Sequence, residues 1–531
     1  MDDYGILSLV PALLTIAVAF YSKNVLLALV SGIISGSLIL ASFNPLHAMQ
    51  IAIENQVLKE VVNGTQIQVV LVIFIIGGFV KLLEVSGGAG AFARKASLIV
   101  TSRSKAQVIV WFSGLGIFFT DSGNSLIIGP LYRSVFDEFK ICREKLAYIL
   151  DTTSSPISIL IPFISWGAYI MSLIEKSYAE IGLSEESFTV LIKVIPYQFY
   201  AFLALATVPI VVFMKKDYGP MRVAQARYLA KIAADNATPI KKMSAENSIE
   251  ESPAEESPAE ESPVKESPVE EKLAEPESET TDDRIGIFLY PLGVMVVLIA
   301  GLITWHATHD GISTVHIRST MIIAYLSASL TCAEMMRRYR SMSYTQSLGV
   351  FIKGAESMVY ISIVLVLAWA LGSVNADVHT ADYIASLIGG SLPPMYFPMI
   401  VFVLGAIISL STGSSYGTFA ILMTIAVPVG FDLGASMYLT IAAVLSGGLF
   451  GDHVSPISDT TVLASVGAQC PHLDHVSTQA AYAGVTGLVA FIAYGLAGAY
   501  ESPMVLPIAV VMLFLSMYFL MRLFGDSDEG T

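Results

Sequence analysis

Long apolar runs recur along the chain, and each is close to the length of a membrane-spanning helix. A helix needs about 20 predominantly apolar residues to cross the hydrocarbon core of a bilayer. The runs occupy 5–21, 24–42, 68–85, 190–214, 285–304, 317–333, 356–374, 478–500 and 503–521. This pattern predicts an all-α, polytopic membrane protein.

Four further apolar segments are interrupted by small polar residues. The segments 107–132 and 398–430 contain "TDSGNS" and "STGSSYG", and we expect each to enter the membrane and return as a hairpin. The segments 146–175 and 436–468 contain "DTTSSPIS" and "DHVSPIS". Proline breaks the helical hydrogen-bond ladder, so both of these segments are predicted to be discontinuous helices.

The positions of Lys and Arg predict the orientation. Basic residues cluster at 94–105, at 133–145, from Lys215 to Lys242 and at 337–340, where "RRYR" follows the run 317–333. The positive-inside rule places these clusters in the cytoplasm. The broken segment 146–175 then leaves the cytoplasm, whereas 436–468 runs toward it. The same order of parts therefore occurs twice with opposite direction, which is typical of inverted repeats that meet at a midplane site.

Composition agrees with this picture and adds a linker. Hydrophobic residues make up 54% of the 531 residues and charged residues only 14%. Of the net charge of −15, a net of −10 lies within 236–282, where fourteen acidic and four basic residues occur among repeats such as "EESPA". Such a segment cannot bury a core and is predicted to be disordered.

The predicted organisation has two transmembrane halves. We expect a first half at 1–216, a cytoplasmic, acidic, Ser/Pro/Glu-rich linker at 217–283, a second half at 284–523 and a cytoplasmic tail at 524–531. About eleven crossings and two hairpins are expected. The three scattered cysteines indicate neither a disulfide framework nor a metal cluster.

The polar breaks carry the candidate chemistry. An aspartate at membrane depth is costly, and its presence indicates a function. Carboxylates, hydroxyls and carbonyls freed at a break supply the oxygen ligands that hard cations prefer. The candidate ion- or substrate-binding residues are Asp121, Asn124, Asp151, Thr152, Thr153, Thr412, Ser414, Ser415, Asp452, Ser455, Ser458, Asp459, Thr460 and Thr461. Asp452 and Asp459 are the first candidates for Na⁺. His453 is expected to be structural, and Trp166 either lines the cavity or packs.

Two long blocks resemble a known family. They are "GDHVSPISDTTVLAS" at 451–465 and the segment 121–170, which contains "REKLAYILDTTSSPIS". Both are similar to signature blocks of the NhaC family of sodium/proton antiporters, within the ion transporter superfamily. The resemblance implies a secondary transporter in a bacterial-type inner membrane. Some relatives exchange malate and lactate with sodium and protons, and others are thought to carry amino acids.

The chain departs from the family pattern at the first hairpin tip. Where the family has Asp-Asp-Tyr-Phe-Asn-Ser, this chain has "TDSGNS", so Thr120 replaces a carboxylate and two small residues replace aromatics. The change removes a charge and widens the space beside the tip, which would either alter the ion stoichiometry or make room for a solute larger than a bare ion. The alternative to sodium/proton exchange is therefore a Na⁺- or H⁺-coupled carrier of small organic acids or amino acids. The absence of a Lys or Arg within the predicted spanning cores counts against that alternative.

Other classes fit the sequence less well. No G-x-x-x-x-G-K-[ST], H-E-x-x-H or G-x-S-x-G motif occurs, so neither ATP-driven transport nor an enzyme is expected. A channel would require a continuous pore rather than paired broken helices. We expect no cofactor and no nucleic-acid partner. The expected partners are the lipid bilayer, Na⁺ and H⁺, with a small carboxylate or amino acid in the alternative and a homodimer as one assembly.

Overall fold

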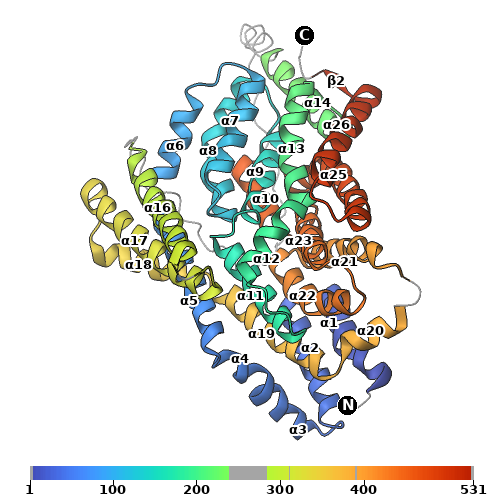
Figure 1. The fold of residues 1–531 in the computed structure, drawn as a ribbon. Helices are drawn as coiled ribbons and strands as arrows, with labels where there is room; N and C mark the ends of the chain where they lie inside the picture. Colours follow the sequence, from blue (N-terminus) through green and yellow to red (C-terminus); the bar gives the residue numbers. More distant parts are fainter. Residues whose placement is uncertain (1–3, 238–283, 310, 389–391, 528–531) are drawn as a thin grey trace, which may run out of the picture.

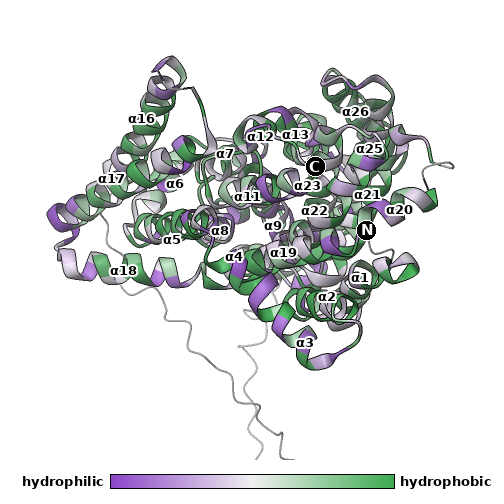
Figure 2. Ribbon diagram, turned by 60° about the horizontal axis from the view of Figure 1, so that its bottom comes forward, coloured by the Kyte–Doolittle hydropathy of each residue, from purple (hydrophilic) through white to green (hydrophobic). Residues whose placement is uncertain are grey.

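The computed structural model describes residues 4–237, 284–309, 311–388 and 392–527, and these are almost entirely helical (Figure 1). Nine helices in the described part are long and apolar enough to cross a membrane, and the pair Ser187–Tyr197 and Phe199–Met214, bent by 45°, raises the count to ten if it forms one span. Figure 2 shows that apolar residues predominate along α5 (Gly64–Val85) and α16 (Gly286–His309). The all-α, multi-pass prediction is confirmed, and eleven crossings stay a prediction.

The first half contains the elements expected of one repeat. Its first seven elements are η1 (Gly5–Leu9), α1 (Val10–Ser22), α2 (Val25–Leu40), α3 (Pro45–Gln50), η2 (Ile51–Leu58), α4 (Lys59–Val61) and α5. They are followed by α6 (Gly88–Ser97), α7 (Arg103–Gly116), α8 (Asp121–Glu138), α9 (Arg143–Thr152), α10 (Ser155–Ser158), α11 (Ser165–Glu180), α12 (Ser187–Val194), η3 (Ile195–Tyr197) and α13 (Phe199–Met214).

The second half also contains a hairpin followed by a broken helix. It contains α16, α17 (Thr314–Arg340), α18 (Tyr344–Glu356), α19 (Val359–Asp377), α20 (Thr380–Ile388), η4 (Pro394–Tyr396), α21 (Phe397–Thr412), α22 (Ser415–Asp432), α23 (Met437–His453), α24 (Asp459–Ala468), α25 (His472–Tyr500) and α26 (Val505–Phe524). The pair α7–α8 thus corresponds to α21–α22, and the broken helix α9–α11 corresponds to α23–α24. The predicted hairpins and discontinuous helices are therefore found where the polar breaks lie.

Helix caps explain why the hairpin tips turn where they do. The Thr120 hydroxyl accepts a hydrogen bond from the Gly123 N–H at 3.0 Å, and the Ser414 hydroxyl accepts one from the Gly417 N–H at 3.2 Å. Each hydroxyl satisfies one of the N–H groups left free in a first helical turn. Gly413, with φ of 63°, supplies the left-handed residue that ends α21.

The two halves are interlocked through their breaks. Helix α24 of the second half packs against α8 and α9 of the first, and α11 of the first half packs against α22 of the second. Gly129 and Gly467 allow the close approach of α8 and α24, because a Cβ at either position would overlap backbone atoms of the other helix. All of these elements lie in the central part of the molecule (Figure 1).

Arginines from the first half bind the end of α24. Arg133 donates to the Gly467 and Val466 carbonyls at 2.7 and 2.9 Å, and Arg143 donates to the Ala468 carbonyl at 3.1 Å. The last carbonyls of a helix have no partner within that helix and carry a partial negative charge. The two guanidinium groups donate hydrogen bonds to these carbonyls and balance their partial negative charge.

The predicted start of the linker is wrong. Residues 217–237 were expected to be disordered, but Asp217 lies in the strand β1 (Lys216–Asp217) and α14 (Gly219–Ala237) follows. Gln225 of α14 accepts a hydrogen bond from the Cys142 N–H at 3.0 Å, and Arg227 pairs with Glu144 at 2.7 Å. These contacts with the start of α9 stabilise a helix that composition alone does not reveal. The rest of the predicted linker, 238–283, lies outside the described residues.

The boundary between the second half and the C-terminal tail also differs from the predicted one. Helix α26 ends at Phe524 rather than at 523, and β2 (Asp526–Ser527) pairs antiparallel with β1. The end of the second half is thereby joined to the end of the first.

The opposite orientation of the repeats can be tested by labelling. In a variant without native cysteines, Ser184→Cys and Ser341→Cys place single thiols at two exposed positions, one after α11 and one after α17. We expect a membrane-impermeant maleimide to label Ser341→Cys only in inside-out vesicles and Ser184→Cys only in right-side-out vesicles, because the basic cluster before 341 is predicted to be cytoplasmic. Labelling of both from one side would contradict the predicted topology.

Candidate functional site

Both hairpin tips and the second helix break open onto one cavity. Its volume is about 650 Å³. Of the predicted site residues, it is lined by Asp121, Thr412, Ser414, Ser415, Asp452, Asp459 and Thr460. The structure thus brings together seven candidates from three segments that are far apart in the sequence.

Three carboxylates differ in their surroundings within this cavity. Asp121 accepts a hydrogen bond from the Trp166 indole N–H at 3.0 Å. Asp452 is only 3% exposed, and its Oδ2 accepts from the Ser415 hydroxyl at 3.0 Å while its Oδ1 has no hydrogen-bond partner. Asp459 is exposed at the start of α24. A buried carboxylate oxygen without a partner is costly, so Asp452 is well placed to bind a proton or a cation.

Aromatic side chains form one wall of the cavity. Trp166 lies 4.6 Å from Tyr416 and 5.9 Å from Phe419, measured between ring centroids. The Tyr169 hydroxyl donates to the Tyr416 carbonyl at 2.9 Å. Trp166 therefore both lines the cavity and packs, so the two interpretations of this residue are compatible.

Charged residues that sequence reasoning missed also line the cavity. Lys81 and Glu84 of α5 lie 3.2 Å apart, and the Thr120 hydroxyl donates to Glu84 at 3.1 Å. Lys353 of α18 lines the cavity as well. The argument that no basic side chain is available for a carboxylate is therefore wrong. The sequence did contain one indication of a basic residue at membrane depth, because Lys81 lies within the predicted span 68–85.

The remaining candidates lie away from the cavity lining. Asn124 donates to the Gly114 and Thr153 carbonyls at 3.3 and 2.6 Å. The Ser455 hydroxyl donates to the Leu410 carbonyl at 2.9 Å, and the hydroxyls of Ser458 and Thr460 lie 3.1 Å apart. The contacts of Asn124 and Ser455 join each hairpin to a break, and the contact between Ser458 and Thr460 lies within the second break.

A second polar cluster, fully buried, contains the other candidates. Asp151 accepts hydrogen bonds from the Thr461 hydroxyl at 3.0 Å and the Gln479 amide at 2.5 Å. His453 bonds to the Tyr200 hydroxyl at 2.7 Å and lies 3.4 Å from the Thr152 hydroxyl. The expectation that His453 is structural fits these contacts. The Thr153 hydroxyl donates to the Ile149 and Leu150 carbonyls of α9.

No group of three or more His, Cys, Asp or Glu side chains in the described part of the chain could hold a metal ion. A sodium ion at Asp452 and Asp459 would therefore depend on neutral oxygens as well. The cavity lining offers several hydroxyls, and those of Thr412, Ser415 and Thr460 are among them.

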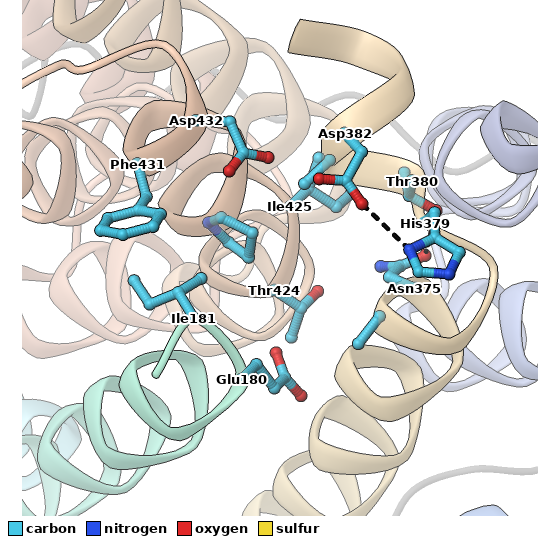
Figure 3. A pocket seen from close by; sticks show the side chains of 13 residues that line it. Glu180, Ile181, Asn375, His379, Thr380, Asp382, Thr424, Ile425, Phe431 and Asp432 are labelled. Carbon is cyan, nitrogen blue, oxygen red and sulfur yellow. Dashed lines mark hydrogen bonds and ion pairs between the residues drawn. The ribbon is translucent and has the colours of Figure 1, made fainter. Parts of the chain in front are cut away.

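A smaller pocket lies at the other ends of the helices that border the cavity. It measures about 280 Å³, and Figure 3 shows Glu180 of α11, Asp432 of α22 and Asp382 of α20 around it. His379 lies 3.0 Å from Asp382. Since Trp166 and Ser415 stand at the beginnings of α11 and α22, the cavity and the pocket mark opposite ends of the same two helices.

Comparison with known proteins identifies the family. The model of the "Na+/H+ antiporter family" matches residues 157–499. The chain belongs to this family. It is a secondary transporter and a multi-pass membrane protein, as the resemblance of the two sequence blocks implied.

The chain is also similar to individual proteins. An uncharacterised protein of Haemophilus influenzae is 30% identical over 508 residues, which cover 92% of this chain and 90% of that protein. The malate-2H(+)/Na(+)-lactate antiporter of Bacillus subtilis is 39% identical over 83 residues, covering 16% of this chain and 18% of the relative. The crystal structure of the YdaH transporter of Alcanivorax borkumensis shares the fold, with a TM-score of 0.56 at 14% identity over 87% of this chain and 90% of that one.

Proposed function

We propose that this family member exchanges Na⁺ for H⁺ by alternating access at the cavity of Asp121, Asp452 and Asp459. The observation that carries the proposal is the convergence of both hairpin tips and these three carboxylates on one space. In this scheme a carboxylate holds either a proton or a sodium ion. Because the two exclude one another, binding of one releases the other.

The oxygen groups around Asp452 suit sodium. Ser415 already donates to one oxygen of Asp452 and leaves the other without a hydrogen-bond partner. The hydroxyls of Thr412 and Thr460 and the carbonyls freed at the breaks add neutral ligands. Hard cations bind oxygen ligands, which are also the groups that broken transporter helices present to coupling ions.

The cavity and the pocket support alternating access. Trp166, Tyr416 and Phe419 lie at the cavity end of α11 and α22, while Glu180 and Asp432 border the pocket at the other end. Between these ends, the Trp369 indole donates to Ser172 at 3.0 Å in a buried contact. In this proposal the aromatic side chains separate two access routes to one site. The protein would lie in the inner membrane with its linker and C-terminus in the cytoplasm.

A second candidate is a Na⁺- or H⁺-coupled carrier of a small carboxylate or amino acid. Lys81 and Lys353 favour it, because an ammonium group at the cavity can pair with a solute carboxylate. A volume of about 650 Å³ is also larger than a bare ion needs.

Proteoliposomes distinguish the two candidates. We expect acid-loaded vesicles to release protons when only Na⁺ is added outside, because the empty carboxylate site exchanges one cation for the other. K⁺ at equal ionic strength is the control. If no protons are released until a carboxylate or amino acid is supplied, the result would favour the second candidate and contradict simple exchange.

A further inference from the structure

The buried cluster around Asp151 lies outside the transport cavity and has no assigned role. Asp151 is 1% exposed, Gln479 1%, and both His475 and Thr461 0%. Its members come from α9, α24 and α25, three elements that meet behind the second helix break. The cluster therefore joins both repeats at a point sealed from water.

Several polar atoms of the cluster have no hydrogen-bond partner. They are Asp151 Oδ1, both ring nitrogens of His475 and Gln479 Oε1. Buried polar groups are almost always paired, and an exception in a native structure calls for an explanation. A group of such atoms around one carboxylate fits a site that binds and releases something small.

The geometry of Asp151 and His475 fits a proton. His475 Nε2 lies 3.6 Å from Asp151 Oδ2, slightly beyond hydrogen-bond range. A buried carboxylate next to a neutral imidazole is an unpaired charge in a low-dielectric environment. When the imidazole takes up one proton it becomes an imidazolium, and the two groups form an ion pair. The site as a whole gains one positive charge and nothing is oxidised or reduced.

The second helix break borders both this cluster and the transport cavity. On α23, Asp452 faces the cavity while His453 contacts the cluster through Tyr200 and Thr152. On α24, Asp459 and Thr460 line the cavity while Thr461 bonds to Asp151. Neighbouring residues of α23 and α24 thus face the two sites from opposite sides of the break, so both sites share the same two helix ends.

Other titratable groups surround the pair. Asp452 and Asp459 interact electrostatically with Asp151, as do His453 and Tyr200. Tyr148 lies near Thr152 on the same helix. Toward the beginning of α9, Lys145 is already paired with Asp217. Among these neighbours, Asp452 and Asp459 add negative charge around Asp151 whenever no cation neutralises them.

We propose that Asp151 and His475 form a proton-binding site separate from the cation site, and that Na⁺ at Asp452 and Asp459 expels its proton by electrostatic repulsion. The inference rests on the proposed function in taking Na⁺ and H⁺ as the coupled ions. It adds a second place for the proton, behind the break rather than in the cavity.

Histidine NMR of the detergent-solubilised protein tests the site without transport. The ring signals of His475 are identified as those missing in His475→Gln. In the unmutated protein we expect them to titrate, and Asp151→Asn to move the midpoint about one pH unit or more to the acid side, since the neighbouring negative charge is lost. Asp432→Asn, an exposed carboxylate at the small pocket, is the matched control and should not move it. An imidazole that stays neutral from pH 5 to 9, or a midpoint indifferent to Asp151, would overturn the proposal.

Transport separates a proton site from a merely structural cluster. We expect His475→Gln to keep ²²Na⁺/Na⁺ exchange at equal pH within about threefold, and to lower Na⁺-driven proton release about tenfold or more, since one pH unit corresponds to a tenfold change in proton occupancy. His309→Gln, at an exposed end of α16, is the control. A parallel loss of both activities would indicate a structural role and count against the proposal.

A second variant covers the case in which His475→Gln does not fold. Gln479→Glu keeps the shape of the side chain and adds a negative charge beside the pair. It should move the pH profile of proton release to the alkaline side, opposite to Asp151→Asn. Shifts in the same direction, or none, would reject the site. Absence of Na⁺ exchange in the unmutated protein would instead reject the proposed function and leave the NMR titration as the judge of the proton site.

Discussion

Asp452→Asn and Asp459→Asn are each expected to abolish Na⁺-dependent transport. The substitution keeps the size of the side chain and removes the negative charge that balances a bound cation. Asp452 is 3% exposed and holds one hydrogen bond from Ser415, so an amide there offers little attraction for a cation in a water-poor environment. We expect a loss of at least about a hundredfold in flux, which corresponds to only about 3 kcal/mol.

The measurement is ²²Na⁺ uptake into proteoliposomes at matched protein content. Glu138→Gln is the matched control, because Glu138 is an exposed carboxylate at the end of α8 and lines neither the cavity nor the small pocket. It should leave uptake within about twofold, as surface substitutions usually do little. Wild-type uptake in both Asp452→Asn and Asp459→Asn would reject the cavity as the cation site.

Of the substitutions proposed for this protein, Lys145→Ala is expected to lower the free energy of unfolding the most. Lys145 and Asp217 lie 2.5 Å apart with side chains only 2% and 3% exposed, and the Tyr482 hydroxyl donates to Asp217 at 2.7 Å. Removing one partner leaves a buried charge without compensation, which costs about 3–5 kcal/mol. The free energy of unfolding can be followed by tryptophan fluorescence in mixed micelles of increasing denaturing detergent.

Two further variants test whether burial of the ion pair causes this loss of stability. Lys193→Ala breaks an exposed pair with Glu185, where the side chains are 50% and 30% exposed, and should cost less than about 1 kcal/mol. Lys145→Met combined with Asp217→Leu removes both charges and should recover much of the loss. Equal effects of Lys145→Ala and Lys193→Ala would show that burial of the first pair does not matter.

Local patterns predicted the parts of this fold that depend on local physics. Apolar runs predicted the spans because bilayer thickness fixes their length, and Pro156 and Pro456, each beside serines, predicted the breaks because proline removes a helical hydrogen bond. Helix α14 was missed because its stability comes from contacts such as Gln225 with Cys142, which no composition records.

The candidate site was likewise predictable from local sequence only in part. The polar breaks predicted which aspartates matter, and Asp121, Asp452 and Asp459 share a cavity. Asp151 looked equivalent to Asp452 in the repeated motif, yet it faces α25 and binds Gln479 instead. The direction in which a residue points depends on which helices pack around the break. The same holds for Lys353, whose helix reaches the cavity by packing against α5.

The arginine contacts at the end of α24 have a mechanical consequence. Through Arg133 and Arg143, the last turn of this helix is tied to α8 and α9 by three hydrogen bonds to carbonyl oxygens. In sequence α24 belongs to the second half, but in any rigid-body motion it would travel with the first. In the proposed alternating-access cycle, the moving units would therefore not coincide with the two sequence halves, and cutting the chain between the halves would not separate these units.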